Sequence, residues 1–119
     1  MDVGNVRIGQ LAGGTVISAQ EESRINCVSG VVLYGSVSYV VQAVQMSTVI
    51  LHPSCAFSFE NTPHMNAIMR AELKSLIVTG APWVGDSVGE KYICLDSAIY
   101  GATTIPGTDS SSVNNCLIR

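Results

Sequence analysis

Four cysteines and two histidines are the residues of this 119-residue chain best suited to metal or redox chemistry. The cysteines are Cys27, Cys55, Cys94 and Cys116. No two of them form the CxxC pair that is typical of zinc sites, and their spacings match no other zinc motif. His52 and Cys55 could share one face of a turn, but two ligands do not make a metal site. The sequence therefore predicts no metal and no cofactor. It favours buried cysteines, with an intersubunit disulfide left open.

Carboxylates and phosphate-binding glycines form no recognisable site either. Asp86, Glu90 and Asp96 do not make a close acidic pair in an apolar setting, so we interpret them as solvated side chains. The pair Gly13-Gly14 is not followed by the GK[ST] sequence that a P-loop needs. The reactive residues alone therefore predict a protein that is not an enzyme and has no small-molecule substrate.

Charge is scarce in this chain. Charged residues make up 13% of it and apolar residues 47%, whereas soluble domains carry about 25% charged residues. A weakly charged exterior suits a protein whose surface is occupied by contacts with neighbours. The net charge of −3 and the scattered basic residues exclude a strong electrostatic nucleic-acid site. Composition thus favours a chain that assembles with copies of itself, and an uncharged monomer is the alternative.

The N-terminal segment and the apolar runs bear on location. Residues 1–5 have neither the basic start nor the apolar core of a signal peptide. No apolar run approaches the ~20 residues that cross a bilayer. We therefore expect no membrane partner, and we expect the protein to be made in the cytoplasm.

Short β-prone runs dominate the first sixty residues and return near the end. We expect strands at 6–11, 15–20, 24–28, 31–34, 36–45, 47–51, 55–59, 92–95 and 98–105. The strand at 36–45 alternates between two faces, and the one expected to be wet holds Ser36, Ser38, Val40 and Gln42. These runs predict an antiparallel sheet.

The spacing of apolar residues predicts a helix from Pro63 to Thr79. Thr62 is a good N-cap, Pro63 fits the first helical position, and Gly80 is placed to end the helix. The residues that recur at helical spacing are Met65, Ile68, Met69, Leu73, Leu76 and Ile77. Pro82 could open a second, shorter helix through Trp83.

Together these elements predict one α+β domain over residues 1–119. Strands occupy 1–60, helices occupy 62–91, and a strand and tail occupy 92–119. No internal repeat is evident. A helix with a single apolar stripe must cover another element, and the predicted sheet is the obvious partner.

Four segments between residues 38 and 92 share a pattern with a known family. Residues 38–45 are similar to a late sheet strand of that family, Ala56-Phe57-Ser58-Phe59 to its last strand, 70–77 to its first helix, and Gly80-Ala81-Pro82 to the break before its second helix. In this pattern the chain resembles the coat proteins of single-stranded RNA bacteriophages. The family's long loop between its last two strands is missing, and the tail from residue 92 extends past the usual end. A permuted strand order, known within the family, could absorb that tail.

This resemblance implies an interlocked homodimer in which helices lie across the partner's sheet. Such dimers would assemble in the host cytoplasm into a virus-like particle, the virion, that encloses RNA. The expected dimer interface is Met65, Ile68, Met69, Leu73, Leu76, Ile77 and Trp83. The expected weak RNA contacts are Arg7, Arg24, Ser36, Ser38 and Gln42, and the alternative is a solvated sheet face without a ligand.

Two other functions stay open. Leu11-Ala12-Gly13-Gly14 resembles the oxyanion-hole glycines of the ClpP-type serine peptidase fold, Ser36 its nucleophile and Asp86 its third triad residue. The position of that family's histidine is Glu60, and either histidine of this chain would need a shifted backbone to replace it. A serine hydrolase or its inactive relic is therefore one alternative. A β-rich phage decoration or tail component is the other.

Overall fold

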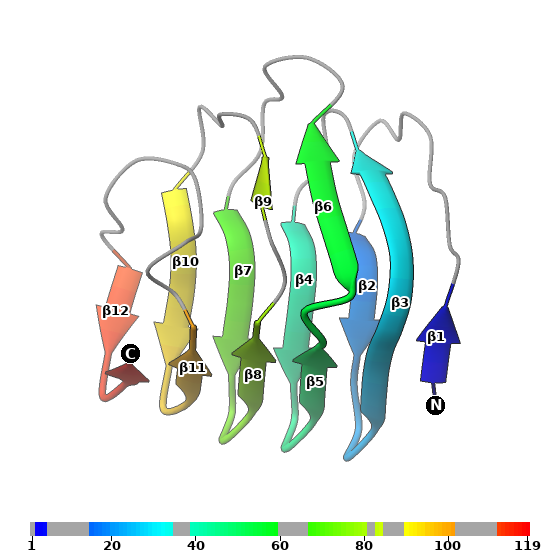
Figure 1. The fold of residues 1–119 in the computed structure, drawn as a ribbon. Helices are drawn as coiled ribbons and strands as arrows, with labels where there is room; N and C mark the ends of the chain where they lie inside the picture. The colour runs from blue at the N-terminus through cyan, green and yellow to red at the C-terminus, as the bar shows by residue number, and fades with distance from the viewer. Residues whose placement is uncertain are drawn as a thin grey trace.

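Residues 2–4, 15–34, 39–59, 67–80, 83–84, 90–101 and 112–119 are described by the computed structural model. Every regular element within these ranges is a β-strand (Figure 1). The strands are β1 (Asp2–Gly4), β2 (Thr15–Ala19), β3 (Arg24–Tyr34), β4 (Tyr39–Val44), β5 (Thr48–Leu51), β6 (Cys55–Phe59), β7 (Ala67–Glu72), β8 (Leu76–Thr79), β9 (Trp83–Val84), β10 (Glu90–Leu95), β11 (Ala98–Tyr100), β12 (Ser112–Asn114) and β13 (Leu117–Ile118).

All paired strands run parallel, and they form two sheets. The eight-stranded sheet has the order β13-β11-β8-β5-β3-β6-β9, with β1 paired to β3, and the five-stranded sheet has the order β12-β10-β7-β4-β2. The chain winds between these sheets in successive coils: β2–β3, β4–β5–β6, β7–β8–β9, β10–β11 and β12–β13. Figure 1 shows the two termini at opposite ends of the stack. This arrangement is a parallel β-solenoid, in which each coil contacts only its neighbours.

The expected α+β fold with an antiparallel sheet is therefore wrong. Residues 67–79 of the expected helix form β7 and β8, which belong to different sheets and are joined by a corner. Two short strands with buried residues on both sides of a corner can reproduce the three- and four-residue spacing of a helical stripe. Trp83, expected in a second helix, begins the short strand β9. The strands expected at 15–20, 47–51 and 55–59 are confirmed as β2, β5 and β6.

Each coil turns from one sheet to the other at a corner, and four of the corners are marked by a serine. The corner serines are Ser23, Ser47, Ser75 and Ser97, separated by 24, 28 and 22 residues. The backbone N–H of each of the first three donates to the hydroxyl of the next, at 3.1, 3.1 and 3.0 Å. We call this row of hydrogen bonds the serine ladder. At a corner the chain changes direction, and backbone N–H groups there lose their acceptors in the sheet. The serine hydroxyls accept hydrogen bonds from these N–H groups instead.

The residues before each corner serine adopt left-handed backbone conformations. In the first three corners two residues have positive φ, and in the last two corners one does: Glu21, Glu22, Gln45, Met46, Leu73, Lys74, Asp96 and Asn115. Each such residue costs about 1–2 kcal/mol relative to the right-handed region. The ladder and the flanking sheets offset that cost, and the positive φ values bend the chain without reversing it.

The corners also reveal the repeat that the sequence expectation missed. Three coils read A-x-x-x-S-x-[IV] and begin at Ala19, Ala43 and Ala71. The last two coils are one residue shorter at the corner and begin at Cys94 and Val113. Because the loops between corners differ in length, no fixed period exists for a self-comparison to detect.

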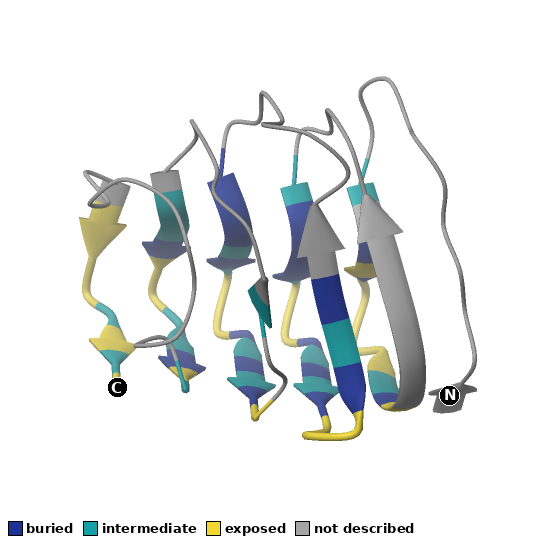
Figure 2. Ribbon diagram, turned by 45° about the horizontal axis from the view of Figure 1, so that its top comes forward, coloured by how far each residue is buried: buried dark blue, intermediate teal, exposed yellow. Residues whose placement is uncertain are grey.

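The core consists of columns of apolar side chains that run along the solenoid. One column holds Ala19, Ala43, Ala71 and Cys94, and another holds Val49, Ile77 and Ile99. All of these residues are buried. Figure 2 shows buried stretches on neighbouring strands of the stack. Burial of an aliphatic side chain of this size contributes about 1.5–3 kcal/mol. Val40 and Gln42, expected on a wet face, are buried as well.

Two disulfides join the coils at each end of the solenoid. Cys27–Cys55 links the first coil to the second, and Cys94–Cys116 links the fourth to the fifth, with Cα–Cα distances of 6.4 and 6.0 Å. The expected burial is confirmed for Cys27, Cys55 and Cys94. Both bonds are within one chain. They stabilise the first and the last of the described coils, which stack on another described coil on one side only.

Candidate functional site

A row of polar side chains crosses three strands of the five-stranded sheet. Ser18, Gln42 and Arg70 are register partners on β2, β4 and β7. The amide of Gln42 donates to Ser18 Oγ at 3.0 Å, and Arg70 Nη1 donates to Gln42 Oε1 at 3.0 Å. The row therefore connects three coils through side chains alone.

Arg70 is the charged centre of this row. Its Nη2 lies 2.8 Å from Glu72 Oε2, and its guanidinium lies 5.3 Å from the centre of the Tyr39 ring. The hydrogen bond to Glu72 raises the pKa of Arg70 above its ordinary value, against the opposing effect of partial burial. Arg70 therefore stays positively charged, and the carboxylate of Glu72 in the same chain balances its charge. The row contains no nucleophile paired with a base, so it predicts a structural role.

The residues expected to contact RNA do not come together in the described part of the chain. Gln42 is 7% exposed and both ends of its amide are engaged in the polar row. Arg24 is exposed at the start of β3, in the other sheet. Arg7, Ser36 and Ser38 lie outside the described residues. RNA binding at these positions stays a prediction.

The residues expected at a dimer interface occupy three different environments. Ile68, Met69 and Ile77 are fully buried within the single chain. Leu76 is half-buried, and Trp83 stacks on Phe57 with ring centres 4.3 Å apart. Leu73 alone among the described members is largely exposed, at a corner, and Met65 lies outside the described residues.

Exposed apolar side chains gather along the corners. Met46 is 55% exposed and Leu73 57% exposed. Together with Gln45, Lys74 and Asp96 they line a shallow groove of about 410 Å³. The groove has apolar walls but contains no catalytic pairing.

The last coil of the described chain carries two exposed apolar side chains. Val113 continues the column of Ala71 and Cys94, yet it is 43% exposed, and Leu117 on the next strand is 42% exposed. Figure 2 shows β12 as an exposed strand at the C-terminal end. We call this surface, formed by β12, β13 and their corner, the C-terminal end face.

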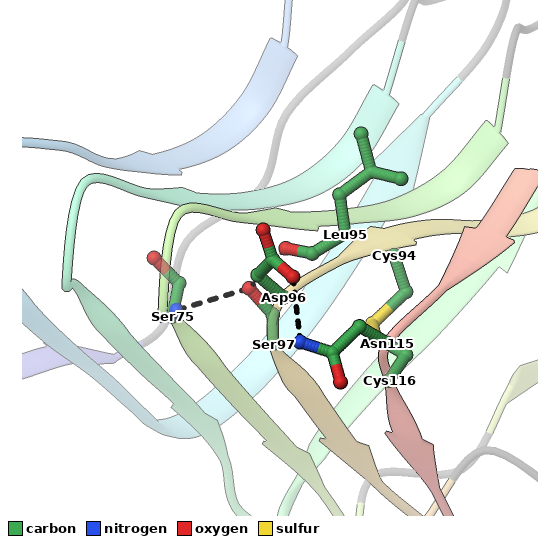
Figure 3. The surroundings of a disulfide bond; sticks show 7 residues. All are labelled: Ser75, Cys94, Leu95, Asp96, Ser97, Asn115 and Cys116. Carbon is green, nitrogen blue, oxygen red and sulfur yellow. Dashed lines mark hydrogen bonds between the residues drawn. A yellow bond between two sulfur atoms is a disulfide. The ribbon is translucent and has the colours of Figure 1, made fainter.

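The serine ladder ends one coil before this face, at Ser97. Cys116 takes the corner position that serine takes in earlier coils, and its sulfur is bonded to Cys94 (Figure 3). Beside it, Asn115 donates to Asp96 Oδ1 at 2.7 Å. Among the described residues, none accepts a hydrogen bond from the Cys116 N–H. The end face therefore carries exposed apolar surface beside a backbone donor that has no acceptor among the described residues.

Comparisons with known proteins give no relatives: no family model, no curated protein and no solved structure matches this chain. Among the described residues, no group of three or more His, Cys, Asp or Glu could hold a metal ion. The same part of the chain has no helix long and apolar enough to span a membrane. The residues compared with the peptidase fold, Gly13, Gly14, Ser36 and Asp86, lie outside the described ranges, and so does Glu60, which stands at the position of that family's histidine.

Proposed function

We propose that this chain is a structural protein that works by assembling with copies of itself. The observation that carries the proposal is the C-terminal end face, where β12 is an edge strand among the described residues and its Val113 is exposed. An open strand edge next to exposed core side chains is a template for pairing with another chain. Because only 13% of the residues are charged, few charges oppose such pairing.

The all-β fold changes which kind of structural protein we propose. The coat family implies helices that interlock across a dimer, and residues 67–79 are strands here. We therefore do not retain the interlocked dimer. A β-rich decoration or tail component agrees with an all-β chain, and we favour it. Enclosure of RNA stays a separate prediction.

The two disulfides bear on where the protein works. Disulfides persist in oxidising settings such as secreted proteins and virion surfaces, and they are rare in a reducing cytoplasm. Both bonds stabilise the ends of the solenoid, where assembly would occur. We propose that the assembled protein functions in an oxidising environment.

Size-exclusion chromatography with light scattering tests this function. The oxidised protein is measured over a hundredfold range of concentration, with negative-stain imaging of the leading peak. We expect species larger than the 12.5 kDa chain whose mass rises with concentration. A monomer at every concentration would contradict the proposal. The 260/280 absorbance ratio of the same peak tests RNA separately, because nucleic acid raises it in an RNA-filled particle and leaves it low in a protein-only assembly.

A further inference from the structure

We infer that two copies of this chain pair side by side through their corners, in antiparallel orientation, about a two-fold axis near Met46. The inference rests on the proposed self-assembly and adds a second contact surface, which lies along the side of the solenoid. We call this surface the corner ridge. It consists of the two positive-φ residues of each of the first three corners: Glu21, Glu22, Gln45, Met46, Leu73 and Lys74.

Backbone hydrogen bonds stack the three corners on one another. The N–H of Glu22 donates to the carbonyl of Gln45, and the N–H of Met46 donates to the carbonyl of Leu73, both at 2.9 Å. Glu22, Met46 and Lys74 are therefore equivalent positions in successive coils, about 4.8 Å apart. All three are exposed, so the ridge presents a negative, an apolar and a positive side chain in that order.

The middle of the corner ridge is apolar and open to water. Met46 and Leu73 are 55% and 57% exposed, more than any other large apolar side chain among the described residues. They form walls of the groove of about 410 Å³. Contact between the ridges of two copies would remove this apolar surface from water, which favours association.

The order of charges selects one way of pairing two ridges. Parallel copies would place Glu22 against Glu22 and Lys74 against Lys74. Antiparallel copies with the axis at Lys74 would bring the two lysines together, and an axis between Met46 and Lys74 would bring Glu22 against Asp96, the next position in the stack. With the axis at Met46, Glu22 of each copy faces Lys74 of the other, and the two methionines meet. Of these arrangements, the last alone brings opposite charges together.

The charged side chains of the ridge are not engaged within the described part of the chain. Arg70 and Glu72 form an ion pair there, whereas Glu22 and Lys74 form none with another described residue. Asp96, one coil beyond Lys74, accepts a hydrogen bond from Asn115 at 2.7 Å (Figure 3). In the antiparallel pair the Lys74 ammonium can therefore bind the Glu22 carboxylate of the second copy.

Pairing through the corner ridge differs in kind from pairing at a strand edge. The same surface patch is used on both copies, so the contact is isologous and closes at two copies. The residues that make it lie between positions 21 and 74, on the side of the solenoid. A side-by-side dimer is therefore compatible with further contacts at the C-terminal end face.

Two charge reversals test this geometry by sedimentation velocity, singly and mixed. Glu22→Lys and Lys74→Glu each exchange one exposed straight-chain residue for another at a positive-φ position. Each variant should therefore keep its fold, which far-ultraviolet circular dichroism checks. Lys91→Glu is the matched control, because it makes the same change near the start of β10, away from the corners.

We expect each single reversal to raise the concentration for half-association by about tenfold or more, because the two-fold axis turns two attractions into two repulsions. An equimolar mixture of Glu22→Lys and Lys74→Glu should associate like the wild type, since each contact between the two variants again joins a lysine to a glutamate. Lys91→Glu should also associate like the wild type.

Association of the wild type that neither reversal weakens would overturn the corner ridge and leave the proposed self-assembly standing. Weakened single variants whose mixture does not recover would overturn the antiparallel pairing. A wild type that stays monomeric at every concentration would instead refute the proposed function itself. A variant that loses its β spectrum is replaced by Glu22→Gln or Lys74→Gln, which removes the attraction at both contacts and should still weaken association about fivefold.

Discussion

At the residue scale, backbone conformation decides which side chains this solenoid tolerates. Gly101 has φ +83° and follows β11, and its N–H donates to the carbonyl of Arg119 at 2.6 Å. A Cβ at this position would lie 1.8 Å from the carbonyl oxygen of Thr79 in the preceding coil. Coils thus approach so closely here that only glycine fits.

Gly101→Ala should destabilise the protein by about 2 kcal/mol or more, because both the positive φ and the contact with a fixed carbonyl penalise the methyl group. Chemical denaturation measures the change. Gly80→Ala is the matched control, since its Cβ would meet the exposed Pro53 ring at 3.2 Å, and it should change stability by less than about 1 kcal/mol. Equal effects of the two substitutions would contradict this account.

At the scale of elements, the corner serines connect strands of successive coils. Ser47 and Ser75 are buried, so the N–H of Ser47 depends on Ser75 Oγ for its hydrogen bond. This dependence explains how corners of left-handed residues persist in the middle of the stack. It also predicts that the contribution of each serine to the free energy of unfolding depends on its position in the ladder.

Ser75→Ala should reduce the free energy of unfolding by about 1–3 kcal/mol, since it leaves the buried Ser47 N–H without an acceptor. Ser23→Ala makes the same chemical change at the exposed end of the ladder and should cost less than about 0.5 kcal/mol in the monomer. Urea denaturation of dilute protein compares the two. A larger loss from Ser23→Ala would show that the ladder does not carry the corner stability.

At the scale of the whole molecule, stability in a solenoid adds up from each coil and its contacts with adjacent coils. The first and last coils have fewer such contacts than the middle ones. The two disulfides close loops with sequence separations of 28 and 22 residues at these positions. They therefore compensate for the contacts that an end coil lacks.

Reduction should lower the stability of the wild type by about 3 kcal/mol for each disulfide lost. The double variant Cys94→Ala/Cys116→Ser replaces one disulfide with the residue types of the inner column and of the ladder. It should therefore keep its fold and respond to reductant only through Cys27–Cys55. Thermal unfolding with and without reductant measures both effects. A wild-type unfolding midpoint that full reduction leaves unchanged would show that the disulfides do not stabilise the end coils.

The sequence by itself located several of the strands, because β-branched and apolar runs mark them locally. The positions of β2, β5 and β6 follow from such runs. The scarcity of charge and the burial of Cys27, Cys55 and Cys94 were also readable, since both depend on residue type. For the polar row, the sequence predicted Gln42 as a polar strand residue but not its partner Arg70.

Only the tertiary structure decided that these strands run parallel and that residues 67–79 are two strands instead of a helix. Ile68, Met69 and Ile77 satisfy a helical spacing, but they are buried here because β7 and β8 each pair with strands of adjacent coils. Those pairings join residues more than twenty positions apart, which no local pattern encodes. The serine ladder adds hydrogen bonds between the corners of the first four coils, and its uneven spacing concealed it in the sequence.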